Sequence, residues 1–456
     1  MKPGRKIKIL HITPHLGGGV GRVLLNYLLK VKDDSIGIHE VVTLEYANEN
    51  AIEVTRKAGI SLTDRMWENT DDLLNRIKQA DIVLIHWWNH PLLYDFMVRN
   101  EFPSSRVIMW SHTSGFNAPY VFNEKIINYP ELFVFTTPIS FETDEIKNLS
   151  EDRIKTLRVV WSTGGVDHVK NVEAKEHSGF NVGYIGTVDY CKMHPDFLDI
   201  CARINVPGIK FIVCGGSKEK EIHNEAEMLG LNSKVRFTGL VSDITPYLSE
   251  FDVFGYPLAP YHYGTCDQAL AESMAAGIVP VVIANRMEKS MVKDGITGIV
   301  TENENEYITA IEELSVNKEL KNRLSNNAKE YAIKTFSLDS IKQEWEKVFE
   351  EALTFSKSSK KWNINKEVSE LSPMDIFLES LGEHGNDFYN YCNSKNENEK
   401  MLYKNKIKEL AKSALWQTET KGTVHHYYSF FKNDSCLSEI SKLMKAAAFT
   451  GDKIDD

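Results

Sequence analysis

The chain has few cysteines, and none of them stands in a pattern that marks a metal site. Its 456 residues include six cysteines, at positions 191, 201, 214, 266, 392 and 436, with no CxxC pair and no zinc-type spacing. This sparse pattern excludes a disulfide-rich secreted scaffold. We therefore expect six reduced thiols in the core and loops of a cytoplasmic protein.

Long apolar runs and an excess of positive charge are absent as well. The N-terminal segment MKPGRKIKILHI has only a short apolar stretch after its basic residues, which predicts a first strand rather than a signal peptide. No later segment is long and apolar enough for us to expect a membrane span. The formal net charge is −11, so broad nonspecific attraction to nucleic acid or anionic lipid is not expected.

Strand-like and helical runs alternate along most of the chain. This pattern is typical of an α/β protein whose parallel sheets are covered by helices on both faces. The expected strands form a first set, 8–13, 39–44, 82–86, 107–111 and 132–136, and a second set, 181–186, 210–214, 235–238, 253–256 and 279–284. Two Rossmann-like domains facing one cleft are the simplest arrangement of the two sets.

The domain limits follow from the same alternation. The first Rossmann-like domain is expected over 1–160 and the second over 161–336, and the second is expected to hold the ligand. A helix over 337–355, containing EWEKVFEEAL, comes next. The polar run SKSSKK at 356–361 then predicts a linker.

Residues 362–456 are predicted to form a small helical appendage, because 374–381 and 399–415 have helical periodicity and few strand signals. An aromatic and histidine cluster extends through this region from Trp416 to HHYYSFF at 425–431. Two interpretations of the cluster stay open. It forms the core of a small helical module, or it lines an acceptor site or the contact of a homodimer.

Residues 251–300 are the most informative part of the chain. They place a lone carboxylate, Glu272, on a small-residue helix that follows a buried strand and a polar loop through Asp267, and Gly277 is expected to end that helix. In such a βαβ unit a ligand binds at the carboxyl ends of the strands, beside a helix start with free backbone N–H groups. Glu272 is therefore well placed to bind a ribose.

This stretch resembles the nucleotide-sugar-dependent, retaining glycosyltransferases of family 4, which have the two-domain GT-B fold. The resemblance also implies that the helix over 337–355 is the closing helix that returns to the first domain. Their helix has a pattern like E-x-F-G-x-x-x-x-E-A-M-A-x-G-x-P-V. The second glutamate matches Glu272 in AESMAAGIVPVV, and a later DGxTG segment matches 294–298. Gly264 stands where the first glutamate belongs, so the contacts of that carboxylate to the donor sugar do not carry over. Asp267 and Gln268, one helical turn further on, are candidates to replace it.

A departing diphosphate needs cations or oriented N–H groups near it. The resemblance implies Lys192 for this role, although Thr187 replaces the arginine that usually accompanies it. The start of the Glu272 helix could add the backbone amides of Asp267, Gln268 and Ala269. Thr265 and Cys266, just before this helix, are further candidates for donor binding. The alternatives without a ligand are that Lys192 is a solvated surface residue and that Asp267 only caps the helix.

The loop Gly17-Gly18-Gly19 follows the first strand, and we expect Gly18 and Gly19 to let the backbone approach the donor closely. A tight turn from strand to helix is the alternative, since the loop is not a G-x-G-x-x-G fingerprint. The resemblance assigns base recognition to strand ends at Gly215 and Leu240.

His112, in MWSHTSG at a strand end of the first domain, is the candidate for contact with the reacting sugar, and a packed core histidine is the alternative. With Lys192 it is the expected catalytic pair. His11, His15 and His86 occupy other strand ends but do not have the spacing of a metal site. The sequence therefore predicts no metal and no cofactor.

The resemblance implies a retaining hexosyltransferase that uses a nucleoside diphosphate sugar, with a UDP-sugar favoured, and an acceptor hydroxyl of a saccharide or glycoconjugate. The leaving phosphate would accept the proton of the acceptor along an oxocarbenium-like path, so no protein base is required. Two other functions stay open: a GT-B sugar-nucleotide epimerase or hydrolase, and a sugar-nucleotide-binding protein that has lost catalysis.

Overall fold

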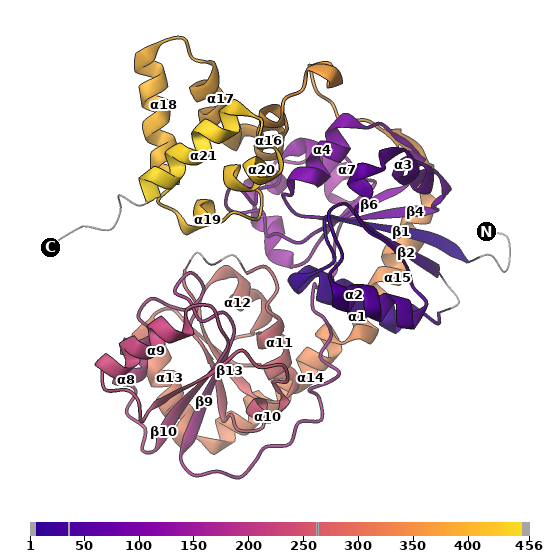
Figure 1. Ribbon diagram of the computed structural model, residues 1–456. Coiled ribbons are helices and arrows are strands. Elements are labelled where there is room, and N and C mark those ends of the chain that lie inside the picture. Colours follow the sequence, from indigo (N-terminus) through magenta and orange to yellow (C-terminus); the bar gives the residue numbers. More distant parts are fainter. Residues whose placement is uncertain (1–5, 35–36, 261, 263, 449–456) are drawn as a thin grey trace. The chain divides into compact units, whose positions relative to one another are not determined.

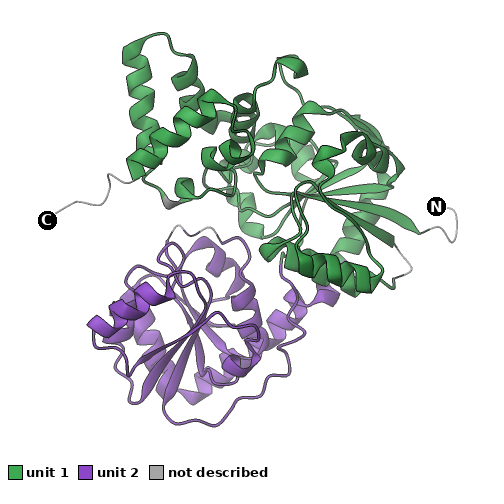
Figure 2. Cartoon of the chain, viewed as in Figure 1, with its two compact units in different colours: residues 1–162, 344–456 green, residues 163–343 purple. Residues whose placement is uncertain are grey.

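The computed structural model describes residues 6–34, 37–260, 262 and 264–448 (Figure 1). The chain forms two compact units (Figure 2). Unit 1 comprises residues 1–162 and 344–456, and unit 2 comprises 163–343. The domain limits predicted from the sequence, after residues 160 and 336, lie close to these divisions.

Unit 1 contains a parallel sheet of seven strands in the order β3-β2-β1-β4-β6-β7-β8. Its strands are β1 (Ile7–Thr13), β2 (Gly37–Thr43), β3 (Ser61–Thr63), β4 (Ile82–Trp87), β6 (Val107–Ser111), β7 (Leu132–Phe135) and β8 (Leu157–Val159). Its helices before residue 162 are α1 (Gly18–Val31), α2 (Glu49–Ala58), α3 (Thr70–Gln79), α4 (Pro91–Arg99), α5 (Glu124–Asn128), α6 (Asp144–Lys147) and α7 (Glu151–Ile154). Every residue of β4 and β6 is buried, as expected for central strands covered on both faces.

Unit 2 contains a second parallel sheet, with the order β11-β10-β9-β12-β13-β14. The strands are β9 (Phe180–Ile185), β10 (Ile209–Cys214), β11 (Val235–Gly239), β12 (Val253–Tyr256), β13 (Val279–Ile283) and β14 (Ile299–Thr301). The helices are α8 (Phe197–Arg203), α9 (Glu219–Met228), α10 (Thr245–Leu248), α11 (Gln268–Ala275), α12 (Arg286–Met291), α13 (Glu304–Val316) and α14 (Lys318–Phe336). The two sets of strands predicted from the alternating pattern are thus confirmed.

The helix predicted after the second domain is α15 (Leu338–Thr354), which belongs to unit 1 from Glu344 onward. Its buried Trp345 packs edge-to-face on Trp110 of β6, with 5.0 Å between ring centroids. The run predicted as a linker is in part a strand. Here β15 (Ser358–Lys360) pairs antiparallel with β5 (Phe102–Ser105), because its backbone satisfies the free edge of that short strand.

The helical appendage is confirmed. It consists of α16 (Pro373–Leu381), α17 (Asn386–Asn393), α18 (Glu397–Leu410), α19 (Ala414–Gln417), α20 (Val424–Phe430) and α21 (Ser435–Ala448). Its apolar side chains, among them Phe377 and Leu437, share one buried cluster with Met109 and Phe133 of the unit 1 sheet. The appendage is therefore continuous with the core of unit 1. Single 3-10 turns lie at Met66–Glu68, Pro138–Glu142, Val368–Glu370 and Gly382–Gly385.

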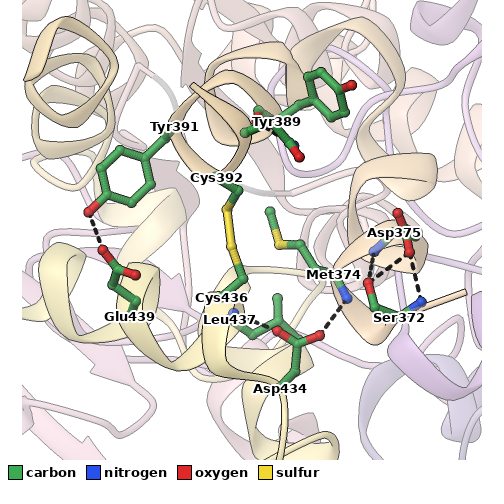
Figure 3. Close-up of a disulfide and its surroundings, with 11 residues drawn as sticks. Ser372, Met374, Asp375, Tyr389, Tyr391, Cys392, Asp434, Cys436, Leu437 and Glu439 are labelled. Atoms are coloured by element: carbon green, nitrogen blue, oxygen red, sulfur yellow. Dashed lines mark hydrogen bonds between the residues drawn. A yellow bond between two sulfur atoms is a disulfide. The ribbon is translucent and has the colours of Figure 1, made fainter. Parts of the chain in front are cut away.

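The expectation of six reduced cysteines is wrong for two of them. Cys392 on α17 and Cys436 on α21 form a disulfide (Figure 3). The two residues are 44 positions apart, and only the packing of the two helices brings their Cα atoms within 6.6 Å. Cys191, Cys201, Cys214 and Cys266 are not part of this disulfide.

No helix within the described residues combines the length and the hydropathy needed to cross a bilayer.

Gly215, at the end of β10, offers a test of the unit 2 packing. Its φ of 151° lies outside the range of ordinary side chains, and an added Cβ would lie 1.8 Å from the carbonyl oxygen of Gly186. We expect Gly215→Ala to destabilise unit 2 by more than about 3 kcal/mol. Gly230→Ala is the matched control, because its φ of 70° imposes strain of about 1–2 kcal/mol with no atom in the way. Hydrogen exchange of peptides from β9 and β10 measures the difference, and equal protection in the two variants would contradict this reading.

Candidate functional site

The site in unit 2 is built around Glu272, which is buried on α11. Its Oε1 atom accepts a hydrogen bond of 2.7 Å from Gln268 Nε2, one helical turn earlier, and lies 3.1 Å from His168 Nε2. Gln268 is itself fixed, since its Nε2 also donates to Gly165 O (2.9 Å) and its Oε1 accepts from Gly164 N (2.7 Å). The segment 164–168 therefore orients the Glu272 carboxylate.

Asp267 is the N-cap of α11, and its carboxylate accepts the backbone N–H groups of Ala269 and Leu270. The same carboxylate accepts from Lys192 Nζ at 3.0 Å and from the Tyr256 hydroxyl at 2.9 Å. Asp267 therefore caps α11, as the alternative interpretation of this residue predicted. The expected amide of Ala269 at this helix start is already bonded within the chain.

The pKa of Asp267 is lowered despite its burial. Burial alone would raise the pKa, but the Lys192 ammonium and the hydrogen bonds from Lys192, Tyr256 and Leu270 N outweigh it. Burial also raises the pKa of the Tyr256 hydroxyl, with the Asp267 charge adding to the effect. Asp267 is consequently an ionised carboxylate, and Lys192 is its counter-ion.

The donor residues proposed at Thr187, Gly215, Leu240, Thr265 and Cys266 lie in unit 2, at or after strand ends. The Thr187 carbonyl, just after β9, accepts from the Tyr184 hydroxyl at 2.9 Å. Gly215 N donates to Gly239 O at 2.9 Å, and a Cβ on the neighbouring Gly216 would lie 2.8 Å from the exposed Leu240 side chain. Thr265 and Cys266 are half-buried in the turn before Asp267.

The structure thus joins Lys192, Asp267, Gln268 and Glu272 in two linked hydrogen-bonded groups on the first turns of α11. It places Gly215 and Leu240 together at the ends of β10 and β11. His168 and Tyr256, which contact Glu272 and Asp267, were missed. His168 could have been found, because it lies near the start of the second predicted domain, directly after the turn-forming residues GGVD at 164–167.

Gly18, Gly19 and His112 lie in unit 1. Gly18 begins α1 with a φ of 61°, the left-handed region that glycine adopts without strain, and nothing lies within 4 Å of a Cβ built on Gly18 or Gly19. His112 follows β6 and is half-buried, and its Nε2 and Nδ1 hydrogen-bond to His86 Nδ1 (3.2 Å) and Ser162 Oγ (3.3 Å).

His112 is one end of a row of four histidines that crosses the unit 1 sheet. His11 bonds to His39 through its Nε2 (2.8 Å) and to His86 through its Nδ1 (3.0 Å), and His86 bonds onward to His112. The register explains the row. His39 on β2 is opposite Ile9, two residues before His11, and His11 is opposite Leu84, two residues before His86. Each step advances two residues, so all the rings stay on one face of the sheet.

The tautomers of these four rings are coupled. A neutral imidazole has one N–H group and one acceptor nitrogen. All three links between the rings are satisfied only if every ring carries its proton on Nδ1, or every ring carries it on Nε2. Burial lowers the pKa of His86 to about 3 and that of His39 to about 4, and it also lowers the pKa values of His11 and His112. The row is therefore neutral at physiological pH.

Among the described residues, one group has side chains close enough together to share a metal ion: His194, Asp196 and Glu304. His194 Nδ1 accepts from Asp196 N at 3.2 Å, and its Nε2 lies 3.3 Å from Glu304 Oε1. Both ring nitrogens are thus used in local contacts at the start of α8. The expectation of metal-independent chemistry stays a prediction.

Comparisons with known proteins bear on these units. Residues 167–331 match the family described as Glycosyl transferases group 1. The lipopolysaccharide core biosynthesis glycosyltransferase LpsE of Rhizobium meliloti (strain 1021) is 27% identical over 143 residues, which cover 31% of this chain and 41% of that protein. The match thus spans less than half the length of this relative.

Solved structures resemble more of the chain. Anabaena Alr3699/HepE in complex with UDP and glucose has a TM-score of 0.58 and 15% identity, over 76% of this chain and 100% of that one. A glycosyltransferase from Rickettsia africae ESF-5 has a TM-score of 0.65 and 14% identity, over 77% of this chain and 100% of that one. The chain therefore has the GT-B fold. Its residues 167–331 are a glycosyl transferases group 1 domain.

The neutral histidine row makes the stability of unit 1 sensitive to acid. The pKa values of these histidines are lower in the folded chain than in the unfolded chain. As the pH falls below about 6.5, the unfolded chain therefore takes up protons first, and the free energy of unfolding decreases by about 1.4 kcal/mol per pH unit for each histidine. We expect the free energy of unfolding to fall between pH 7.5 and pH 5. Tryptophan fluorescence during urea unfolding measures it selectively, because all eight tryptophans lie in unit 1.

A variant with His11→Leu and His86→Leu should reduce this pH slope by up to about 2.7 kcal/mol per pH unit. His384→Gln is the control, because its half-exposed ring lies outside the row, and it should leave the slope unchanged. An unaltered slope in the double variant would show that the row is not the source of the acid sensitivity.

Proposed function

We propose that the chain is a retaining glycosyltransferase of the family 4 type, which moves a hexosyl group from a UDP-sugar to a hydroxyl of a saccharide or glycoconjugate. The observation that carries the proposal is the buried Glu272 carboxylate, held by Gln268 and His168 at the strand ends of a glycosyl transferases group 1 domain. The UDP bound in the Anabaena relative, which has the same fold, supports the choice of donor.

Glu272 would bind the ribose of the donor. A carboxylate can accept two hydrogen bonds from neighbouring hydroxyls, and each such bond to a charged group contributes about 1.5–3 kcal/mol. Gln268 and His168 reduce the rearrangement that binding requires, because Glu272 is already oriented. The loop ends at Gly215 and Leu240 would contact the base.

Lys192 would contact the diphosphate. Its ammonium is already paired with Asp267, and Thr187 supplies no charge where an arginine is usual, so the site offers less positive charge than the resemblance implies. A donor diphosphate would have to draw Lys192 from Asp267 or share it. We infer that Asp267 lowers the affinity for the diphosphate and makes release of the nucleotide product easier.

In the proposed reaction the bond from the anomeric carbon to the diphosphate oxygen breaks, and a bond to the acceptor oxygen forms on the same face of the sugar. The acceptor proton passes to the leaving phosphate, so the nucleoside diphosphate leaves as the second product. His112 is the proposed contact of unit 1 with the transferred sugar, as a neutral imidazole. No metal and no cofactor is part of this proposal.

The reduced positive charge at Lys192 favours one alternative, a sugar-nucleotide-binding protein without catalysis. Incubation with UDP-glucose, UDP-galactose and UDP-N-acetylglucosamine and analysis of the products separates the candidates. Release of UDP with transfer to an acceptor supports the transferase, and release with free sugar indicates a hydrolase. A changed sugar without UDP release indicates an epimerase, and binding without any product indicates the degenerate protein.

Glu272→Gln should weaken UDP binding by about ten- to a hundredfold, because the amide cannot accept both ribose hydroxyls as a charged group. Isothermal titration calorimetry measures the affinity. Glu302→Gln is the control, since that exposed carboxylate lies after β14 and pairs with Lys289, and it should bind UDP as the unaltered chain does. Equal affinity of the two variants would remove Glu272 from the site.

Asp267→Asn should tighten UDP binding by about three- to tenfold, because Lys192 loses its competing counter-ion while asparagine still caps α11. Uridine without phosphates is the internal control, and its affinity should not change. If UDP binds more weakly to Asp267→Asn, the carboxylate holds Lys192 in its binding position instead of competing with the donor.

A further inference from the structure

The appendage is fastened to the strand-end edge of the unit 1 sheet. Asn89, just after β4, accepts from the Tyr427 hydroxyl of α20 at 3.0 Å and donates to Ser380 Oγ of α16 at 3.2 Å. A Cβ added to Gly422 would lie 2.3 Å from Asn89 Cγ, so the backbone before α20 also packs directly on this loop. The appendage thus contributes side chains at the edge where parallel sheets bind ligands.

Histidines from both parts meet at this edge. The ring of His90, after β4, contacts His426 of α20 with 4.8 Å between centroids and Phe430 with 5.4 Å. His15, after β1, lies 6.1 Å from His90 and stacks on Tyr46 at 5.3 Å. We call His15, His90, His426 and Phe430 the edge cluster.

Two buried nitrogens of the edge cluster have no hydrogen-bond partner within the described residues: His90 Nε2 and His15 Nδ1. His90 is 1% exposed, and its Nδ1 accepts from Leu92 N at 3.3 Å, so its Nε2 carries the proton and is a donor. The Glu45 carboxylate lies 3.4 Å away without forming a hydrogen bond. A buried donor without an acceptor is costly, which points to an acceptor supplied by a ligand.

One member of the edge cluster, Phe430, also lines a groove of about 1240 Å³ in the appendage. Figure 3 shows part of its lining, with Tyr389 and Tyr391 of α17 near the disulfide between Cys392 and Cys436. Tyr389 is 53% exposed, so its ring is open to a ligand.

The charges along the groove balance. Three lysines line it, Lys366, Lys400 and Lys432, together with the carboxylates of Asp375, Asp434 and Glu439. All three carboxylates are engaged in the protein. Asp375 accepts from Ser372 and Lys366, Asp434 from Met374 N and Leu437 N, and Glu439 from the Tyr391 hydroxyl. A groove with the open aromatic ring of Tyr389, fixed polar groups and no net charge suits a polyhydroxylated, uncharged ligand.

We propose that the appendage binds the acceptor, and that the acceptor is an uncharged oligosaccharide. Its reacting end lies at the edge cluster, where hydroxyl oxygens satisfy His90 and His15, and its further sugar units lie along the groove on Tyr389. This inference rests on the proposed glycosyltransferase function and names the class of its acceptor.

Saturation-transfer NMR on the full chain tests the proposal, with maltohexaose, cellohexaose and mannohexaose as uncharged probes and a heparin hexasaccharide as a charged one. We expect at least one uncharged probe to bind, and Tyr389→Ala to weaken it tenfold or more. Leu402→Ala is the matched control, because Leu402 is also 53% exposed but lies on α18 outside the groove lining. It should bind the probe as the unaltered chain does.

Calorimetry with UDP on the same variants separates this proposal from the proposed function. If UDP binds equally to the unaltered chain and to Tyr389→Ala while only the saccharide is lost, the appendage site is supported. If UDP binds but no uncharged probe does, or if Tyr389→Ala leaves saccharide binding intact, the appendage site is overturned and the donor site stands. Binding of the heparin fragment alone overturns the uncharged class. Failure of the unaltered chain to bind UDP overturns the proposed function itself.

Discussion

The buried carboxylate of Asp267 is the constraint on which the strand ends of unit 2 depend. An ion at this depth must be compensated, since an unpaired buried charge costs several kcal/mol. Compensation requires Lys192, the Tyr256 hydroxyl and two N–H groups of α11 to converge on one residue. This convergence fixes where α11 begins, and therefore where Gln268 and Glu272 lie on its first turns.

The same constraint shapes the chemistry that we propose. Lys192 is the one cation that the resemblance assigns to the diphosphate, and Asp267 holds it. The ribose anchor and the phosphate contact are thus linked through a single helical turn, because Gln268 orients Glu272 while its neighbour Asp267 pairs with Lys192.

Unit 1 follows a different principle, in which buried polar groups satisfy one another. The four histidines of the row lie on β2, β1 and β4 and just after β6, and they need no charged partner, because each neutral ring hydrogen-bonds to its neighbour in the row. Close by, the edge cluster leaves His90 and His15 unsatisfied. Because of this contrast, we propose that unit 1 binds a ligand at the edge cluster and not at the histidine row.

Much of the fold could be predicted from the sequence, because strands such as Val107–Ser111 and Val253–Tyr256 are short apolar runs bounded by turn signals, and parallel pairing follows from the helices between them. The end of α11 at Gly277 could also be predicted from a local signal, because glycine readily adopts the positive φ, here 82°, that follows the last turn of a helix. Contacts between distant segments could not be predicted from the sequence. The disulfide of Cys392 with Cys436, the pairing of β15 with β5 and the contact of His426 with His90 all depend on tertiary packing.

In the candidate site, too, the local features could be predicted and the long-range contacts could not. Glu272 could be found from its position on a helix after a buried strand, and Asp267 from its place as a cap. The pairing of Asp267 with Lys192 could not, because it joins residues 75 positions apart across two strand ends. His39 was overlooked because a histidine at the start of a strand reads as a surface residue until the register aligns it with His11.

The central claim is that Glu272 binds the ribose of a nucleoside diphosphate sugar. Calorimetric comparison of UDP with 2′,3′-dideoxyuridine diphosphate tests it most directly, because the two ligands differ only in the hydroxyls that Glu272 would contact. The account predicts that the dideoxy compound binds at least about tenfold more weakly. Equal affinity for the two ligands would contradict it.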